Sequence, residues 1–251
     1  MLQFEGVTFG YPTDELNMME NLSFSVNKGA FVAVIGPSGC GKSTLFRLIN
    51  GLEVADAGTI TIEGEDVAKK KNFSAFMPQK DLLFPWRTIG KNVALPMELT
   101  KAPKDLQEKR VAEVLEQVGL SGYVDKFPNE LSGGMKQRAA FARTLLSGAE
   151  MLLLDEPFSA LDYLTRVEMQ EWLLQQYSHF HKTILFITHD VEEAIFLAKD
   201  IYIITDERPF AQMEKIPVPL SYPRKREDLK HPDIVELKES LIGKLRKQVV
   251  L

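Results

Sequence analysis

The spacing of hydrophobic residues along the chain predicts two kinds of β-strand. Residues 2–11 and 21–26 alternate between apolar and polar side chains, a period of two that is typical of half-buried antiparallel strands. Other runs are apolar at every position, which favours strands buried on both faces of a sheet. These continuous runs are 31–35, 151–154, 184–188 and 201–205, and residues 59–62 and 73–77 are further strand candidates.

Segments with helical spacing separate the buried runs. Residues 42–50 follow the first of them, and 161–177 and 191–199 lie between the later ones. Residues 81–148 are also mostly helical, because their apolar side chains recur three and four positions apart. Strands that alternate with helices are typical of a mostly parallel sheet with right-handed crossovers. We therefore predict an α/β fold with a mostly parallel core sheet, an N-terminal antiparallel β subdomain and a helical subdomain at about 81–148.

The last part of the chain, residues 206–251, has a different pattern. Prolines recur through its first half, which predicts irregular structure, and apolar residues at helical spacing then predict one amphipathic helix over 233–247. A segment of this length with one helix cannot bury much of a core by itself. We therefore predict one large unit over 1–205, followed by a tail whose helix packs on that unit.

Composition excludes several classes of protein. The chain has 251 residues, with 30 Lys and Arg against 35 Asp and Glu, a net charge of −5 at pH 7. This balance argues against nucleic-acid binding, which usually needs a basic face. The single cysteine, Cys40, excludes an internal disulfide and a multi-cysteine metal site. No leader sequence is evident and no apolar run approaches the roughly 20 residues that span a bilayer, so we expect a cytoplasmic protein.

One glycine-rich loop carries the strongest chemical signal. Residues 36–44 fit the phosphate-loop pattern G-x-x-x-x-G-K-[ST], and they follow a buried strand and open a helix, as the motif requires. The glycines let backbone N–H groups turn toward an anion, and the helix N-terminus adds a positive dipole end. Lys42 is expected to reach the β- and γ-phosphates of ATP, and the Ser43 hydroxyl to bind Mg²⁺. The predicted nucleotide-binding residues here are Gly36, Pro37, Ser38, Gly39, Cys40, Gly41, Lys42, Ser43 and Thr44.

An acidic pair follows the apolar run at 151–154. Asp155 and Glu156 are expected at the carboxyl end of a strand, where open α/β sheets bind ligands. We expect Asp155 to hold Mg²⁺ through a water, and Glu156 to act as the general base for the water that attacks the γ-phosphate. A strand that ends in Asp-Glu means little alone, but beside a phosphate loop it indicates nucleotide hydrolysis.

A third motif narrows the family. Residues 131–135 read Leu-Ser-Gly-Gly-Met, and with this motif the chain resembles the ATP-binding subunits of ABC transporters. The other motifs of that family follow in the family's order, over about residues 1–205. The family's Q-loop glutamine, D-loop aspartate, switch histidine and adenine-stacking aromatic correspond to Gln79, Asp162, His189 and Tyr11. The resemblance implies a P-loop NTPase fold of the ABC ATPase type, with ATP and Mg²⁺ as its cofactors.

The resemblance also implies that two copies cooperate. The Ser-Gly-Gly part of the third motif is expected at the N-terminus of a helix, where it forms a second anion site. One chain that already has a phosphate loop does not need a second site for the γ-phosphate. In this family such a site completes the nucleotide pocket of another copy, which implies a head-to-tail dimer with two ATP molecules at the interface. His189 would then bind the γ-phosphate and orient Glu156, and Gln79 would sense Mg²⁺ and the water. The second anion site consists of Ser132, Gly133 and Gly134.

Two features resemble one group of importers, those for nitrate, sulfonate and taurine. Met135 stands where the commoner family pattern has Gln, and methionine cannot donate an amide hydrogen bond. The segment 82–88 (LLFPWRT) resembles the same group, and Trp86 between Pro and Arg has the composition of an interaction hot spot. The resemblance implies that membrane-spanning permease subunits dock near residues 83–86, from Leu83 to Trp86; the alternative is a core patch of the helical subdomain.

The resemblance thus implies the ATP-hydrolysing subunit of an importer for a small solute. Such a subunit is peripheral on the cytoplasmic face of the membrane, and a solute-binding protein serves it indirectly. An ATPase switch that acts on nucleic acid or the ribosome is the main alternative, although such relatives usually join two cassettes or insert a coiled coil. A regulatory nucleotide-binding module would lack Glu156 or His189. Tyr11 could instead be a core residue, and Asp162 only the N-cap of the helix that follows.

Overall fold

The computed structural model describes residues 1–70, 72–180, 182–204 and 208–246. The predicted boundary at 205/206 lies outside these ranges, as do the last residue of the predicted strand 201–205 and that of the predicted helix 233–247. Within the described ranges, no helix is both long and apolar enough to cross a membrane.

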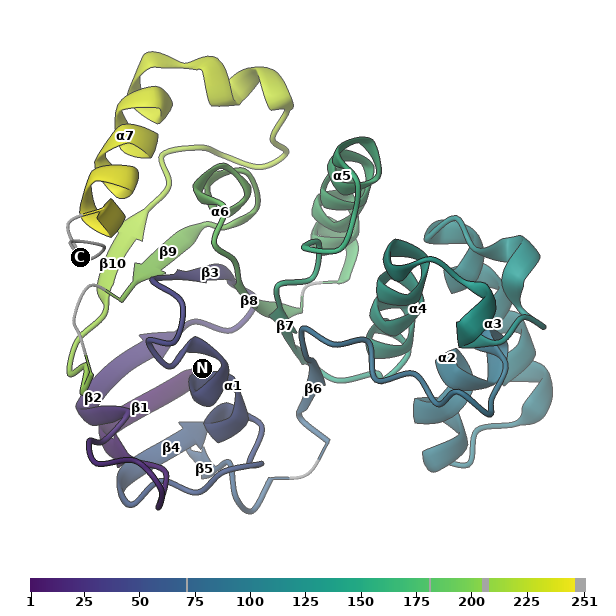
Figure 1. Cartoon of the computed structure of the whole chain (residues 1–251), viewed down its shortest axis with the longest axis horizontal. Helices are drawn as coiled ribbons and strands as arrows, with labels where there is room; N and C mark the ends of the chain where they lie inside the picture. Colours follow the sequence, from purple (N-terminus) through teal and green to yellow (C-terminus); the bar gives the residue numbers. More distant parts are fainter. Residues whose placement is uncertain (71, 181, 205–207, 247–251) are drawn as a thin grey trace.

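The N-terminal residues form an antiparallel sheet with the strand order β2-β1-β4-β5, at the lower left of Figure 1. Leu2 and Phe4 are buried, and a register shift beside Gly6, whose φ is +59°, restores burial at Val7 and Phe9. This confirms the predicted N-terminal antiparallel subdomain. Its strands are β1 Leu2–Phe9, β2 Met19–Val26, β4 Ala57–Ile62 and β5 Glu65–Asp66.

The core sheet has the strand order β10-β9-β3-β8-β7-β6. Strands β3, β7 and β8 are buried at every residue, as expected for strands covered on both faces. All neighbouring pairs from β9 to β6 are parallel, which confirms the predicted mostly parallel core. The strands are β3 Phe31–Ile35, β6 Ser74–Met77, β7 Met151–Asp155, β8 Thr183–Ile187, β9 Asp200–Ile203 and β10 Glu214–Pro217.

The edge strand β10 corrects one sequence expectation. We predicted irregular structure for the first half of the tail, but Glu214–Pro217 pairs antiparallel with β9, with Ile216 opposite Ile201. The strand is short, polar and closed by a proline, which is tolerated at a sheet edge because one row of backbone groups there needs no partner strand. Because its residues do not alternate between apolar and polar side chains, the sequence of this strand cannot be distinguished from that of a loop.

Helices cover both faces of the core sheet. One buried cluster joins α1 to both sheets, and a second joins the opposite face of the core sheet to the remaining α-helices. The α-helices are α1 Lys42–Ile49, α2 Ile89–Leu99, α3 Lys104–Gln117, α4 Gly133–Leu145, α5 Tyr163–Phe180, α6 Val191–Leu197 and α7 Pro232–Arg246. The 3₁₀ helices are η1 Ser121–Tyr123, η2 Pro128–Glu130 and η3 Arg226–Lys230.

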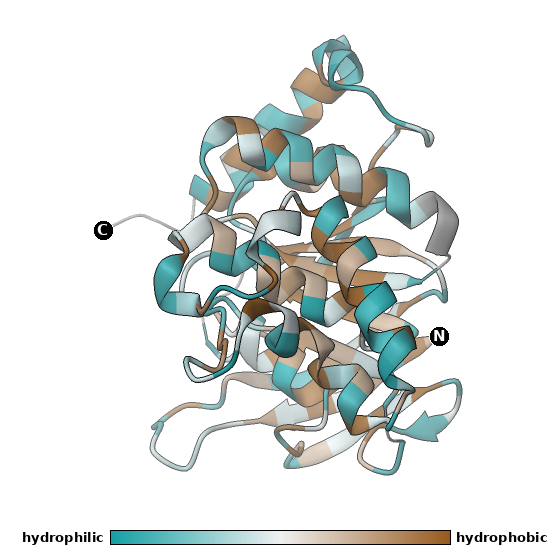
Figure 2. Cartoon of the chain, turned by 90° about the vertical axis from the view of Figure 1, so that its right-hand side faces the viewer, coloured by the Kyte–Doolittle hydropathy of each residue, from teal (hydrophilic) through white to brown (hydrophobic). Residues whose placement is uncertain are grey.

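Helices α2, α3 and α4 gather beside β6 and β7, on the side of the molecule away from the N-terminal sheet (Figure 1). Figure 2 looks at this side and shows hydrophilic and hydrophobic residues in turn around the helices, so that each offers an apolar stripe to its neighbours. Val93, Val111 and Leu115 from α2 and α3 are buried in the resulting core.

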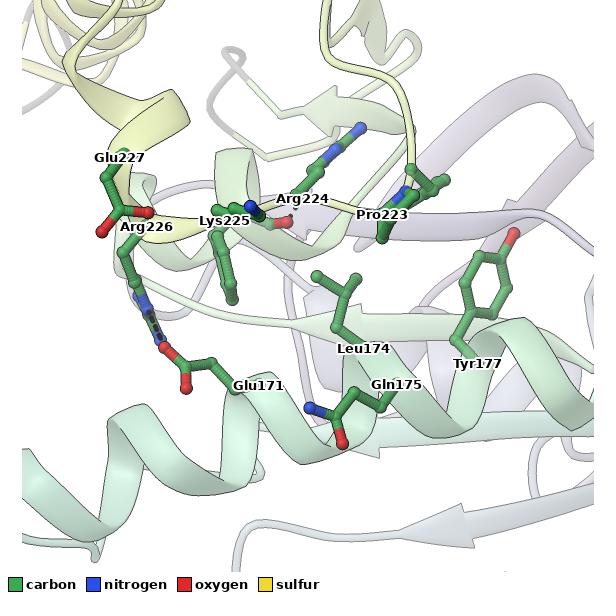
Figure 3. Close-up of a pocket in the computed structure, with 11 residues that line it drawn as sticks. Glu171, Leu174, Gln175, Tyr177, Pro223, Arg224, Lys225, Arg226 and Glu227 are labelled. Atoms are coloured by element: carbon green, nitrogen blue, oxygen red, sulfur yellow. Dashed lines mark hydrogen bonds and ion pairs between the residues drawn. The ribbon is translucent and has the colours of Figure 1, made fainter.

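The tail packs on the core sheet through α6 and α7. Arg224 is buried and donates to the carbonyl oxygens of Ile195 and Ala198 at 2.7 Å each, which satisfies the C-terminal end of α6. Ile234 and Leu241 of α7 are buried in the same core. A cavity of about 750 Å³ lies between α5 and residues 222–227 (Figure 3).

Candidate active site

The phosphate loop joins β3 to α1, and its conformation depends on glycine. Gly41 is the N-cap of α1 with φ +108°, and a Cβ there would lie 2.9 Å from Met18 and 3.0 Å from Phe210, so a larger residue would be strained and crowded. Lys42 folds over the loop, and its Nζ donates to the carbonyl oxygens of Gly36 at 2.9 Å and Pro37 at 2.8 Å. The loop thus presents one cation at its centre.

Cys40 faces inward from the loop. Its side chain is buried, and burial raises the pKa of the thiol, so it does not behave as a reactive thiolate at neutral pH. A Cβ added at Gly36 would lie only 3.1 Å from Cys40 Sγ. The thiol therefore packs beneath the loop.

Two oxygen groups of the kind that magnesium prefers lie near each other, one from Ser43 in the first turn of α1 and one from Asp155 at the end of β7. The Ser43 side chain lies close enough to the Asp155 carboxylate to favour its charged form. Burial raises the pKa of Asp155, and the Ser43 side chain and the nearby Lys42 charge oppose that rise. The Ser43 hydroxyl, the Asp155 carboxylate and the Lys42 ammonium group therefore lie close together beside the phosphate loop.

Three adjacent strands bring three predicted catalytic residues together. Met77 of β6 is level with Leu154 of β7, and Asp155 is level with Ile187 of β8, so the residues that follow these strands meet at one edge. Gln79 Nε2 donates to Glu156 Oε2 at 2.9 Å, and His189 Nδ1 lies 3.5 Å from Glu156 Oε1.

The backbone at Glu156 is unusual, because its φ is +49°, in the left-handed region. Its N–H donates to the Ile187 carbonyl oxygen at 3.0 Å, which continues the β7–β8 ladder while the chain turns. Such a conformation is costly for a residue with a side chain. Here it directs the carboxylate toward Gln79 and His189.

The predicted second anion site begins α4. Ser132 is the N-cap, and its Oγ accepts a hydrogen bond from the Met135 N–H at 3.3 Å, while Gly133 and Gly134 form the first turn. Ser132 and Gly133 are exposed. Helix α4 lies on the opposite side of β6 and β7 from α1 (Figure 1), so this site and the phosphate loop occupy separate places in one chain.

Tyr11 lies beside the phosphate loop. Its hydroxyl is 3.2 Å from Thr44 Oγ1 and accepts from Arg47 at 3.4 Å. The ring is partly exposed and packs edge-on against Phe9, with 5.0 Å between ring centroids. Tyr11 is therefore anchored next to α1 with part of its surface free, and adenine stacking stays a prediction.

Two site residues escaped the sequence analysis. Gln137 of α4 is buried, donates to the Glu156 carbonyl oxygen at 3.0 Å and accepts from the Ala160 N–H at 2.9 Å. Arg208 donates from two nitrogens to the Gly39 carbonyl oxygen, at 2.9 and 2.6 Å. Both act on groups distant in the sequence, so no local pattern marks them.

A buried carboxyl group also lies next to His189. Glu193 is 7% exposed, and burial raises its pKa to about 7; the charge of Asp190 adds to the rise, whereas Thr188 and Arg166 lower it. Because the pKa is higher in the folded than in the unfolded chain, Glu193 costs stability once the pH rises above about 4.5.

We expect this cost to appear as a pH-dependent difference between wild type and Glu193→Gln. From pH 5 to pH 8 the unfolding free energy of the wild type should fall relative to the variant by on the order of 2 kcal/mol, because only the wild type must ionise a buried carboxyl. Urea denaturation at both pH values measures it. An unchanged difference would show that Glu193 titrates normally.

Comparisons with known proteins agree with this geometry. The family model described as "ABC transporter" matches residues 19–159. The aliphatic sulfonates import ATP-binding protein SsuB of Bacillus thuringiensis is 43% identical, over 87% of this chain and 85% of its own. The formylaminopyrimidine import ATP-binding protein ThiZ of Halalkalibacterium halodurans is 42% identical, over 90% and 88%.

A solved structure shares the fold. The ATP-binding cassette MJ0796, as a dimer in a post-hydrolysis state bound to ADP and Pi, is similar with a TM-score of 0.79 and 26% sequence identity, over 88% of this chain and 100% of that one. The phosphate loop, the acidic pair and the third motif occur here within that shared architecture. The chain is an ATPase and belongs to the ABC transporter family of ATP-binding proteins.

Proposed function

We propose that this chain is the ATPase subunit of an importer and that two copies build each hydrolysis site together. The observation that carries the proposal is the pairing of a complete hydrolytic cluster with a second anion site that lies apart from it. Glu156, Gln79 and His189 meet beside the phosphate loop, whereas Ser132 begins α4 across β6 and β7. The dimeric MJ0796 cassette supports the arrangement.

In the proposed site each residue has one task. The backbone of residues 36–44 cradles the phosphates, and Lys42 exchanges its loop carbonyls for phosphate oxygens. Glu156 accepts the proton of the attacking water, while Gln79 and His189 hold its carboxylate in place. Ser132 and its helix N-terminus, from the second copy, bind the γ-phosphate.

The Ser43–Asp155 pair is where Mg²⁺ would bind. Ser43 would supply an oxygen ligand directly and Asp155 would hold the ion through a water, so that nucleotide oxygens and water would supply most of the near-octahedral coordination that the ion requires. When bound, Mg²⁺ supplies positive charge that neutralises the phosphates during transfer.

A groove beside the helical region is the proposed docking site for the permease. A cavity of about 580 Å³ there is lined by both apolar and polar residues, and Leu52 and Leu82 on its wall are each 60% exposed. Phe84 also lines it, and Trp86, 72% exposed, packs on Phe84 with 5.2 Å between ring centroids. Within the predicted segment 83–86, Phe84 lines the groove and carries Trp86 beside it, whereas Leu83 is buried in the core.

The docking proposal predicts the effect of Trp86→Asp. A charge at an exposed aromatic hot spot should weaken binding to membrane subunits by at least about 30-fold, or roughly 2 kcal/mol. The ATPase rate of the isolated subunit should stay unchanged, because Trp86 lies outside the hydrolytic cluster. Co-purification from the native host measures binding, with Val235→Asp on the exposed face of α7 as the control. Equal recovery of permease with both variants would contradict the docking site.

We further propose that the transported solute is small and polar, of the nitrate, sulfonate or taurine kind or a related organic compound. The similarity to sulfonate and formylaminopyrimidine import proteins supports this class. The subunit would then sit on the cytoplasmic face of the membrane, and a solute-binding protein would select the solute. Identification of the permease that co-purifies tests the proposal, and recovery of ribosomes or DNA instead would overturn it.

A further inference from the structure

We propose that Glu193 is a positioning residue for hydrolysis, which holds His189 against Glu156 by fixing the Thr188 hydroxyl. The inference rests on the proposed role of His189. It assigns a task to a buried carboxyl group that the hydrolytic cluster itself does not use. Glu193 lies in the first turn of α6 and contacts neither the phosphate loop nor Glu156 through any hydrogen bond of the described residues.

The direction of two hydrogen bonds supports the proposal. The Asp190 N–H lies 3.0 Å from Thr188 Oγ1 and can only donate, so the hydroxyl oxygen is the acceptor. The Thr188 hydroxyl therefore donates its own hydrogen bond to Glu193 Oε2, which lies 2.5 Å away. Thr188 and Asp190 are the two neighbours of His189, so both flanks of the histidine are tied to one carboxyl group.

His189 needs such support because little else holds it. Its side chain is 69% exposed, and it touches Glu156 at a distance of 3.5 Å. The position of the ring is therefore set largely by its backbone. Asp190 also caps α6 by accepting from the N–H groups of Glu192 at 2.8 Å and Glu193 at 3.2 Å, which closes residues 188–193 into one hydrogen-bonded turn.

The surroundings of Glu193 fix where its carboxylate lies. Oε1 is buried without a hydrogen bond of normal geometry among the described residues, and the side chains of Arg166 and Gln170 favour its charged form. Arg166, from α5, donates to the Leu161 carbonyl oxygen at 3.0 Å. A cavity of about 20 Å³ at this point is lined by Glu156, Ser159, Arg166, His189 and Glu193, among others. The carboxylate is thus buried next to the hydrolytic cluster.

The positioning role needs a hydrogen-bond acceptor at residue 193 and a hydroxyl at residue 188. Glu193→Gln keeps an acceptor oxygen for Thr188, whereas Glu193→Ala removes it. Thr188→Val keeps the shape of the side chain and removes the hydroxyl. These variants separate the loss of the hydrogen bonds from a general loss of packing.

The test is steady-state ATP hydrolysis by the purified full chain, made with and without His189→Ala. With His189 present, Thr188→Val and Glu193→Ala should lower kcat between about tenfold and a hundredfold, the range for a misplaced catalytic group. Glu193→Gln should stay within about threefold of wild type, and KM for ATP should stay within about twofold for all three. In the His189→Ala background, none of the three should lower kcat further.

Equal losses of kcat in both backgrounds would overturn the inference, because a residue with a merely structural role acts whether or not His189 is present. A rise in KM at constant kcat would overturn it as well. If His189→Ala alone leaves kcat unchanged, His189 has no role in hydrolysis. A loss of kcat in Thr188→Val would then come from another cause and would contradict the inference too. Thermal unfolding of each variant identifies losses that come from unfolded protein. The proposed import function would stand in every case, since it depends on the permease.

Discussion

Replacement of Glu156 by glutamine is expected to abolish ATP hydrolysis while ATP binding persists. The carboxylate accepts from Gln79 at 2.9 Å and lies 3.5 Å from His189. Glutamine has the same shape but cannot take a proton from water. General-base catalysis contributes about 10² to 10⁴ in rate, so the hydrolysis rate should fall by at least about a hundredfold.

The same variant should accumulate as an ATP-bound dimer, since hydrolysis is what would reopen it. Size-exclusion chromatography with and without ATP measures this, together with the rate of phosphate release. Glu150→Gln is a matched control, because Glu150 lies at the other end of β7 with its side chain 73% exposed. A Glu156→Gln protein that stays monomeric with ATP would count heavily against the two-copy site.

The second large effect is expected from Ser132→Arg. Ser132 is exposed at the start of α4, and a long cation there would block the approach of another copy and remove the hydroxyl. Hydrolysis should fall at least about a hundredfold, whereas the isolated chain should bind nucleotide as wild type does.

The loss of an N-cap must be separated from the loss of the site, because an N-cap alone contributes about 1 kcal/mol to stability. Thr88→Arg provides the control, since Thr88 caps α2 in the same way by accepting from the Lys91 N–H at 3.3 Å. Comparable loss of hydrolysis in both variants would show that Ser132 acts through helix stability. Nucleotide affinity is measured by titration of the monomer.

The core of the fold could be predicted because its signals are local. The continuous apolar runs predicted at 31–35 and 151–154 correspond to the buried strands β3 and β7. The phosphate loop follows the first run, and the acidic pair follows the second. Parallel pairing of β6, β7 and β8 then places Gln79, Glu156 and His189 together. Alternating and continuous apolar patterns depend only on residues that are neighbours in the sequence, so they can be recognised in a single sequence.

The parts that escaped prediction depend on contacts between distant segments. Edge strand β10 pairs on one side, so its residues need no apolar pattern. Leu83 is as apolar as Leu82 and Trp86 nearby, which are exposed, yet its own side chain is buried in the core. The sequence gives no sign of this difference. Gln137 stands in α4 between two basic residues, and no local pattern marks its role, because its partners lie about twenty positions away.

Complementation between two inactive variants tests the shared site most directly. Lys42→Ala damages the phosphate loop and Ser132→Arg damages the second anion site, so each protein alone should be inactive. In a mixed dimer, one pocket combines the intact loop of one copy with the intact Ser132 of the other, so hydrolysis should return when the two proteins are mixed. The control is wild type mixed with a variant that carries both Lys42→Ala and Ser132→Arg. If wild type keeps full activity in that mixture while the two single variants stay inactive together, each chain hydrolyses ATP alone.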